Sequence, residues 1–126
     1  MSRYDADWCA ALAGGVGTSS GLTAPIRILY VVTDTEEGKA AFWLSDDGKT
    51  FGALAGKLPR GEKADITITA KESVLLALWA GRRTRDEAFM AGDVKVEGAY
   101  AHWLDQVVPT FEAAPWSEAW ATASKL

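Results

Sequence analysis

The sequence of 126 residues has few of the side chains that build metal centres and cross-links, with one cysteine, Cys9, and one histidine, His102. A single cysteine cannot form an internal disulfide, which favours a reducing compartment. One cysteine and one histidine also fall short of the nitrogen and sulfur ligands that a zinc cluster needs. We therefore expect no metal and no cofactor, and we expect Cys9 to be a small buried hydrophobe rather than a reactive thiol.

An excess of positive charge is also missing. Thirteen basic and seventeen acidic residues give a formal net charge of −4. The electrostatic attraction that drives nucleic-acid binding is therefore absent, and no nucleic-acid partner is expected. The one basic cluster, Arg82-Arg83-Thr84-Arg85, falls between two predicted helices, and we interpret it as a solvated loop.

Long apolar runs are absent too. No run approaches the about 18 residues that indicate a transmembrane helix, and the N-terminus lacks the charged-then-apolar profile of a secretory signal. The expected location is the cytoplasm. The terminal tripeptide Ser124-Lys125-Leu126 would act as a peroxisomal address only if it were exposed in a source that has peroxisomes.

What the sequence has in excess is tryptophan. Six occur in the chain, which is 48% hydrophobic and 24% charged and long enough for one hydrophobic core. They are Trp8, Trp43, Trp79, Trp103, Trp116 and Trp120. Because each large aromatic side chain needs about 150–250 Å² of apolar cover, either the core is aromatic or a ligand covers part of it.

The hydrophobic periodicity predicts one domain over residues 1–126, of the α/β (α+β) class. Alternating apolar residues predict strands at about 24–33, 39–45, 49–54, 64–69 and 93–97. Helical spacing predicts helices at about 3–13, 70–80, 85–91, 99–111 and 115–124. The first strand is apolar on both faces, so we expect it to be central in the sheet.

Local signals place the boundaries of these elements. The first three strands should form an antiparallel meander, with a hairpin at Asp46-Asp47-Gly48. Gly14-Gly15 is expected to end the first helix, and Pro109 to bend or end a later one. Three residue pairs match helix-capping patterns, namely Ser2/Asp5, Thr69/Glu72 and Thr84/Glu87.

No catalytic pattern fits its structural context. Residues 17–21, Gly-Thr-Ser-Ser-Gly, match the letters of a nucleophile elbow, but that motif needs a strand before it and a helix after it, and here the order is reversed. The acidic pairs of the sequence lie in turns or at helix starts, where a negative charge needs no catalytic explanation. We predict no catalytic residue and a protein that is not an enzyme.

Three motifs follow one another between residues 63 and 98. A strand with Ala64-Asp65-Ile66-Thr67-Ile68-Thr69 leads to the Leu-rich helix around residues 73–78, which Gly81 ends. The segments Ala88-Phe89-Met90-Ala91-Gly92 and Lys95-Val96-Glu97-Gly98 complete the set. In order, spacing and residue type this stretch resembles the sterol carrier protein 2 family, and the aromatic residues after Gly98 resemble its small stand-alone bacterial members.

The resemblance implies a five-stranded, mostly antiparallel or mixed sheet with helices over one face and a hydrophobic tunnel between them. It also implies non-catalytic binding and intracellular transfer of an apolar lipid such as a fatty acid, a fatty acyl-CoA or a sterol. The helical apolar positions that we expect to line the tunnel are Leu75, Leu78, Trp79, Phe89, Met90, Trp103, Val107 and Phe111. Trp116 and Trp120 are candidates for a lid.

Two alternatives stay open on the residues alone. One is a small α+β cavity enzyme of the ketosteroid-isomerase type, which needs an acid in an apolar pocket, and Asp105 is the nearest candidate. The other is an interaction module that docks through the face of Trp116 and Trp120. Besides the lipid ligand, the candidate partners are a membrane surface, in transient contact, and a second copy of the chain that pairs through the C-terminal helix.

Overall fold

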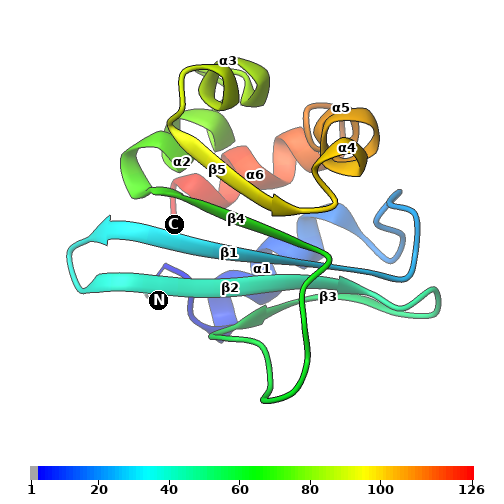
Figure 1. Cartoon of the computed structure of the whole chain (residues 1–126). Helices are drawn as coiled ribbons and strands as arrows, with labels where there is room; N and C mark the ends of the chain where they lie inside the picture. The colour runs from blue at the N-terminus through cyan, green and yellow to red at the C-terminus, as the bar shows by residue number, and fades with distance from the viewer. Residues whose placement is uncertain (1–2) are drawn as a thin grey trace.

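Five strands form one mixed sheet in the computed structural model, which describes residues 3–126 (Figure 1). The strands are β1 (Ile26–Thr35), β2 (Gly38–Asp46), β3 (Phe51–Ala55), β4 (Ile66–Lys71) and β5 (Val94–Gly98). Their order is β3-β2-β1-β4-β5, and only the β1–β4 pair is parallel. The predicted antiparallel meander, the mixed sheet and the central place of the first strand are confirmed.

The helices pack on one face of this sheet. They are α1 (Ala6–Val16), α2 (Glu72–Trp79), α3 (Arg85–Met90), α4 (Tyr100–His102), the π-helical turn η1 (Trp103–Val107), α5 (Val108–Phe111) and α6 (Trp116–Ser124). Figure 1 shows α1, α2 and α6 behind the strands, whereas the loop from β3 to β4 hangs on the opposite side.

The helix predicted at 99–111 is present as three consecutive helical segments, α4, η1 and α5. It is not ended by Pro109, which lies in the first turn of α5. A proline is tolerated there because the first turn does not use its missing N–H.

The two faces of the sheet differ in cover. Along β1 the residues Ile26, Ile28, Tyr30 and Val32 are buried beneath the helices, and the residues between them are only partly covered. This alternation is the signature of a strand with one fully buried face. The other face carries Leu29, Val31 and Trp43. Leu29 lies opposite Trp43 in the β1–β2 register, and Val31, two residues further along β1, points to the same face as Leu29.

Aromatic rings fill the space between the sheet and the helices. Trp79 of α2 stacks on Trp120 of α6 with ring centroids 5.1 Å apart, and Tyr30 stacks on Phe42 at 4.8 Å. Edge-on contacts, such as the one between Trp8 and Phe42 at 5.0 Å, join these stacks to α1. An aromatic core therefore accounts for most of the indole surface.

Two predicted boundaries of the first helix are wrong. The helix begins at Ala6, and the Asp5 side chain accepts a hydrogen bond from the Trp8 amide at 2.8 Å, which makes Asp5 the N-cap. Ser2 lies outside the described residues. The helix also continues through Gly14-Gly15 to Val16, because Gly15 packs so closely on α6 that a Cβ there would lie 3.0 Å from the Ala119 Cβ.

The predicted cap at Thr69 is also wrong, because Thr69 belongs to β4 and pairs with Val31 and Lys95. The strand passes directly into α2, and Lys71 is an N-cap without a side-chain hydrogen bond. The other local signals are confirmed. The Thr84 hydroxyl accepts from the Glu87 amide at 3.2 Å, and the Asp47 carboxylate accepts from the amides of Lys49 and Thr50 in the β2–β3 hairpin.

Candidate functional site

The larger apolar hollow lies on the sheet face that the helices leave uncovered. We call it the sheet-face groove. It has a volume of about 830 Å³, which falls in the range of about 300–1,000 Å³ that small-molecule pockets occupy. Its lining residues are Leu29, Val31, Lys39, Ala40, Ala41, Gly56, Lys57, Leu58, Glu62, Lys63, Ala64 and Thr67. None of the residues predicted to line a tunnel is among them.

A smaller hollow, the Arg85 pocket, lies on the helical side between α2, α3, α5 and α6. Its volume is about 260 Å³. It is lined by Leu78, Trp79, Gly81, Arg83, Thr84, Arg85, Phe111, Glu112, Ser117 and Trp120. The fold thus brings three predicted lining residues, Leu78, Trp79 and Phe111, together with the predicted lid residue Trp120.

The remaining predicted lining residues have other places. Leu75, Trp103 and Val107 are buried in the core, and Phe89 is half-buried on α3. Met90 is 83% exposed. None of these five lines either hollow. Helical spacing identifies apolar positions, but it does not show which of them face packed rings and which face open space.

The two candidate lid residues differ in how firmly they are held. Both are 1% exposed, so their apolar face is covered within the chain itself. The indole N–H of Trp116 donates to the Ser20 carbonyl oxygen at 2.7 Å. Among residues 3–126, the Nε1 of Trp120 has no acceptor. Moving the Trp120 side chain therefore breaks no hydrogen bond, whereas moving Trp116 breaks one.

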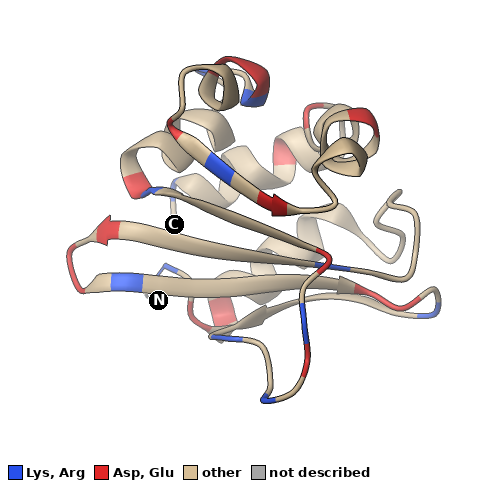
Figure 2. Ribbon diagram, viewed as in Figure 1, with Lys and Arg blue, Asp and Glu red and all other residues tan. Residues whose placement is uncertain are grey.

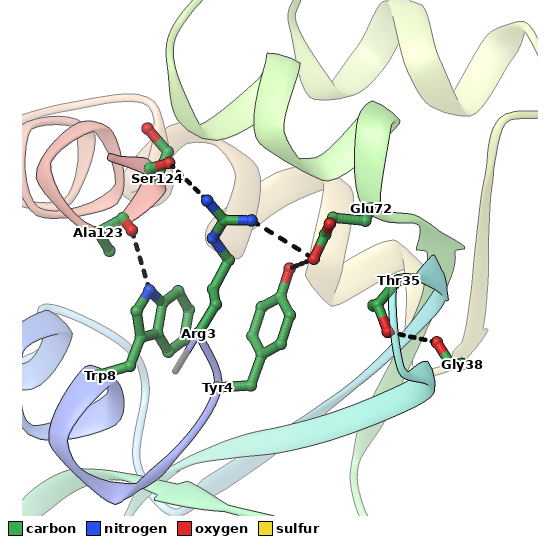
Figure 3. Close-up of polar contacts among 8 residues, drawn as sticks. All are labelled: Arg3, Tyr4, Trp8, Thr35, Gly38, Glu72, Ala123 and Ser124. Atoms are coloured by element: carbon green, nitrogen blue, oxygen red, sulfur yellow. Dashed lines mark hydrogen bonds and ion pairs between the residues drawn. The ribbon is translucent and has the colours of Figure 1, made fainter. Parts of the chain in front are cut away.

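A polar network holds the backbone of α6 in place (Figure 3). At the end of this helix the Ala123 carbonyl accepts from the Trp8 indole at 2.9 Å, and the Ser124 carbonyl accepts from Arg3 at 3.4 Å. Arg3 also lies 3.6 Å from the Glu72 carboxylate, which accepts from the Tyr4 hydroxyl at 2.8 Å. Hydrogen bonds thus hold both ends of α6, through Trp116 at its start and through Ala123 and Ser124 at its end. An opening at Trp120 therefore requires its side chain to move rather than the helix.

Arg85, one of two basic residues that line the pocket, was expected in a solvated loop, and for this residue the prediction is wrong. Its side chain is only 5% exposed, and it shares the buried face of α3 with Ala88, three residues later. The spacing to Ala88 was the available signal, since residues three apart lie on one face of a helix. Arg85 also contacts the core, where burial raises the pKa of Tyr30 to about 12 and the nearby guanidinium opposes that rise.

The acid that the sequence suggested for an enzyme of the ketosteroid-isomerase type does not lie at either hollow. Asp105 is exposed on η1 and lines neither of them. In the part of the chain that the structure describes, no cluster of three His, Cys, Asp or Glu residues could hold a metal ion, and no helix is long and apolar enough to span a membrane. Figure 2 shows acidic and basic residues interspersed over loops, strands and helices.

The sheet order and the helical layer define an α+β domain with apolar hollows on both sides of its sheet. The family model for the SCP-2 sterol transfer family matches residues 27–104, so the chain belongs to that family. Sterol carrier protein 2 of Bos taurus is 39% identical over 70 residues. These residues are 55% of this chain but only 12% of the bovine protein.

Solved structures agree with this fold. A possible sterol carrier protein of Thermus thermophilus is 15% identical, with a TM-score of 0.68 over 98% of this chain and 90% of that one. A crystal structure of sterol carrier protein 2 gives 19% identity and a TM-score of 0.62 over 98% and 95%. A stereoselective inverting sec-alkylsulfatase from Pseudomonas sp. contains a similar fold in 14% of its chain, at 21% identity over 75% of this chain and a TM-score of 0.57.

Proposed function

We propose that this chain binds an apolar lipid, such as a fatty acid, a fatty acyl-CoA or a sterol-like molecule, and transfers it within the cytoplasm without catalysis. The observation that carries the proposal is the Arg85 pocket, which Leu78, Trp79 and Phe111 line together with Trp120, whose indole has no acceptor among the described residues. Membership of the SCP-2 sterol transfer family supports the same function.

The pocket volume of about 260 Å³ is too small for a lipid unless a side chain moves. Displacing the Trp120 indole exposes about 150–250 Å² of apolar surface, at a cost of roughly 4–6 kcal/mol. A chain of about 15 methylenes gains about 12 kcal/mol on burial. The difference of about 6–8 kcal/mol corresponds to a dissociation constant of roughly 1–40 µM before ordering costs.

This balance predicts a strong dependence on chain length. A chain of about seven carbons gains only about 6 kcal/mol, which the displacement of the indole cancels. Long-chain lipids are therefore the ligands of the proposed site. An affinity in the micromolar range also suits a carrier, because the cargo must leave again.

Two blocking substitutions test where the lipid binds. Ser117→Trp places an indole in the Arg85 pocket, and the matched variant Ala41→Trp places one in the sheet-face groove, both from half-buried positions. Binding is measured by displacement of a fluorescent fatty acid with oleate, after circular dichroism has shown that each variant is folded. We expect Ser117→Trp to weaken oleate binding at least tenfold and Ala41→Trp to leave it unchanged.

Each other outcome has a defined meaning. Loss of binding only in Ala41→Trp would assign the lipid to the sheet-face groove. No saturable binding of oleate, oleoyl-CoA or cholesterol by the wild-type chain would refute the proposed function. Transfer itself is measured as the rate at which a fluorescent lipid moves from donor to acceptor vesicles. If the protein does not change this transfer rate, the chain binds lipid but does not transport it, and the transfer part of the proposal is refuted.

A further inference from the structure

The Arg85 guanidinium is buried between helices, and only part of it is paired with an acceptor. Its side chain is 5% exposed, and its Nη1 lies 3.6 Å from the Glu112 carboxylate, which also accepts from the Arg85 amide at 2.9 Å. The guanidinium lies over the rings of Phe111 and Trp120, 5.5 and 6.0 Å from their centroids. Its second terminal nitrogen, Nη2, is shielded from solvent and makes no hydrogen bond among residues 3–126, and the Tyr30 hydroxyl lies near enough to the guanidinium to be influenced by its charge.

A second unpartnered donor belongs to a residue of the same pocket, since Trp120 Nε1 is also buried and has no acceptor in the part of the chain that the structure describes. A buried donor without a partner is costly, and the cost is greatest when the donor is charged. Both donors belong to residues that line one hollow, and the charged donor of Arg85 calls for an occupant that supplies an oxygen acceptor. The surrounding walls of Leu78, Trp79 and Phe111 require the rest of that occupant to be apolar.

We propose that the ligand of the Arg85 pocket carries a carboxylate, which the Arg85 guanidinium binds through Nη2 when Trp120 moves aside. This inference rests on the proposed function and names the head group of its lipid. A carboxylate matches the planar fork of a guanidinium. A phosphate dianion fits less well because Glu112 places a negative charge against the same guanidinium.

The comparison of oleate with oleyl alcohol tests the head group alone, because the two share one hydrocarbon chain. We expect the wild-type chain to bind oleate at least about tenfold more tightly, since hydrogen bonds to charged partners are the stronger ones. Arg85→Met, which keeps an unbranched apolar side chain, should abolish this preference. Arg82→Met is the matched control, because Arg82 is exposed and lines neither hollow.

Glu112→Gln provides a second variant in case Arg85→Met does not fold. It removes the carboxylate that competes for the guanidinium, so oleate should bind severalfold more tightly and oleyl alcohol should be unaffected. Equal affinity of the wild-type chain for acid and alcohol would overturn the inference and leave lipid binding intact. A preference that persists in Arg85→Met would also overturn it. If the wild-type chain binds neither ligand, the proposed function fails as well.

Discussion

Replacing Trp120 by alanine tests whether a ring of the core occupies the ligand site. The indole is 1% exposed and stacks on Trp79 with the ring planes 6° from parallel. Phe111, Trp116 and Tyr30 surround it, with ring centroids 5.4, 5.5 and 5.7 Å away. The substitution therefore leaves an apolar space walled by rings, directly beside the Arg85 pocket.

The magnitudes follow from this burial. Truncating a large aromatic side chain in a core costs about 3–5 kcal/mol, which lowers the melting temperature of a chain of this size by roughly 10–20 °C. A ligand that fills the vacated space no longer displaces an indole, which removes a cost of roughly 4–6 kcal/mol. Octanoate, too short for the wild-type chain, should then bind the variant.

Thermal unfolding with and without octanoate measures both effects. We expect a lower melting temperature for Trp120→Ala and a rise of several degrees on adding octanoate, with no rise for the wild-type chain. At a concentration 100 times the dissociation constant the stabilisation is about 2.7 kcal/mol. Trp43→Ala is the matched control because it removes an indole from the opposite face of the sheet. If octanoate stabilises neither variant, or both equally, the reasoning is refuted.

Three further predictions concern stability. Glu72→Gln weakens the contacts of the Glu72 carboxylate with Tyr4 and Arg3. It should lower the free energy of unfolding, measured in urea, by about 1–2 kcal/mol. The control Glu118→Gln changes an exposed side chain and should alter this free energy little. Burial raises the pKa of the Cys9 thiol from 9.0 to about 11, so the folded chain holds that proton more tightly than the unfolded chain. Stability should therefore fall as the pH rises from about 9 to about 11, and Cys9 should react with iodoacetamide at pH 8 only after denaturation; rapid labelling of the folded chain would contradict this. Gly98→Ala should destabilise the fold by more than about 1 kcal/mol. Gly98 has a φ of +93°, and an added Cβ would overlap the Asp65 carbonyl oxygen. The control Gly14→Ala should not destabilise the fold, because Gly14 has open space around it and no positive φ.

Much of the fold could be predicted from the sequence because local chemistry and periodicity agree there. The five strands, the β2–β3 hairpin and the Thr84 cap follow from alternation, turn residues and capping chemistry. The errors occur where tertiary packing overrides a local signal. Gly15 continues a helix because α6 packs against it, and Thr69 extends a strand because two neighbouring strands pair with it.

The candidate site was less predictable. The spacing of Leu78, Trp79 and Phe111 shows that they are buried, but their meeting at one hollow depends on how α2, α5 and α6 converge. Arg85 was missed for a different reason. An arginine among other arginines at a helix start suggests a solvated loop, and only its shared face with Ala88 argues otherwise. Burial of a charge depends on partners distant in sequence, here Glu112, Phe111 and Trp120.

Hydrogen bonding distinguishes Trp120 from Trp8 and Trp116, the other tryptophans that the terminal helices contribute to the core. The segment that matches the family, residues 27–104, excludes α1 and α6, which contribute Trp8, Trp116 and Trp120 to the core. Trp8 and Trp116 each donate a hydrogen bond to a carbonyl oxygen, as expected of side chains that fix the helices in place. Trp120 has no acceptor among residues 3–126, although it is equally buried. Its displacement would cost apolar burial and ring contacts but no hydrogen bond of its own, and a sufficiently long hydrocarbon chain can offset the loss of burial.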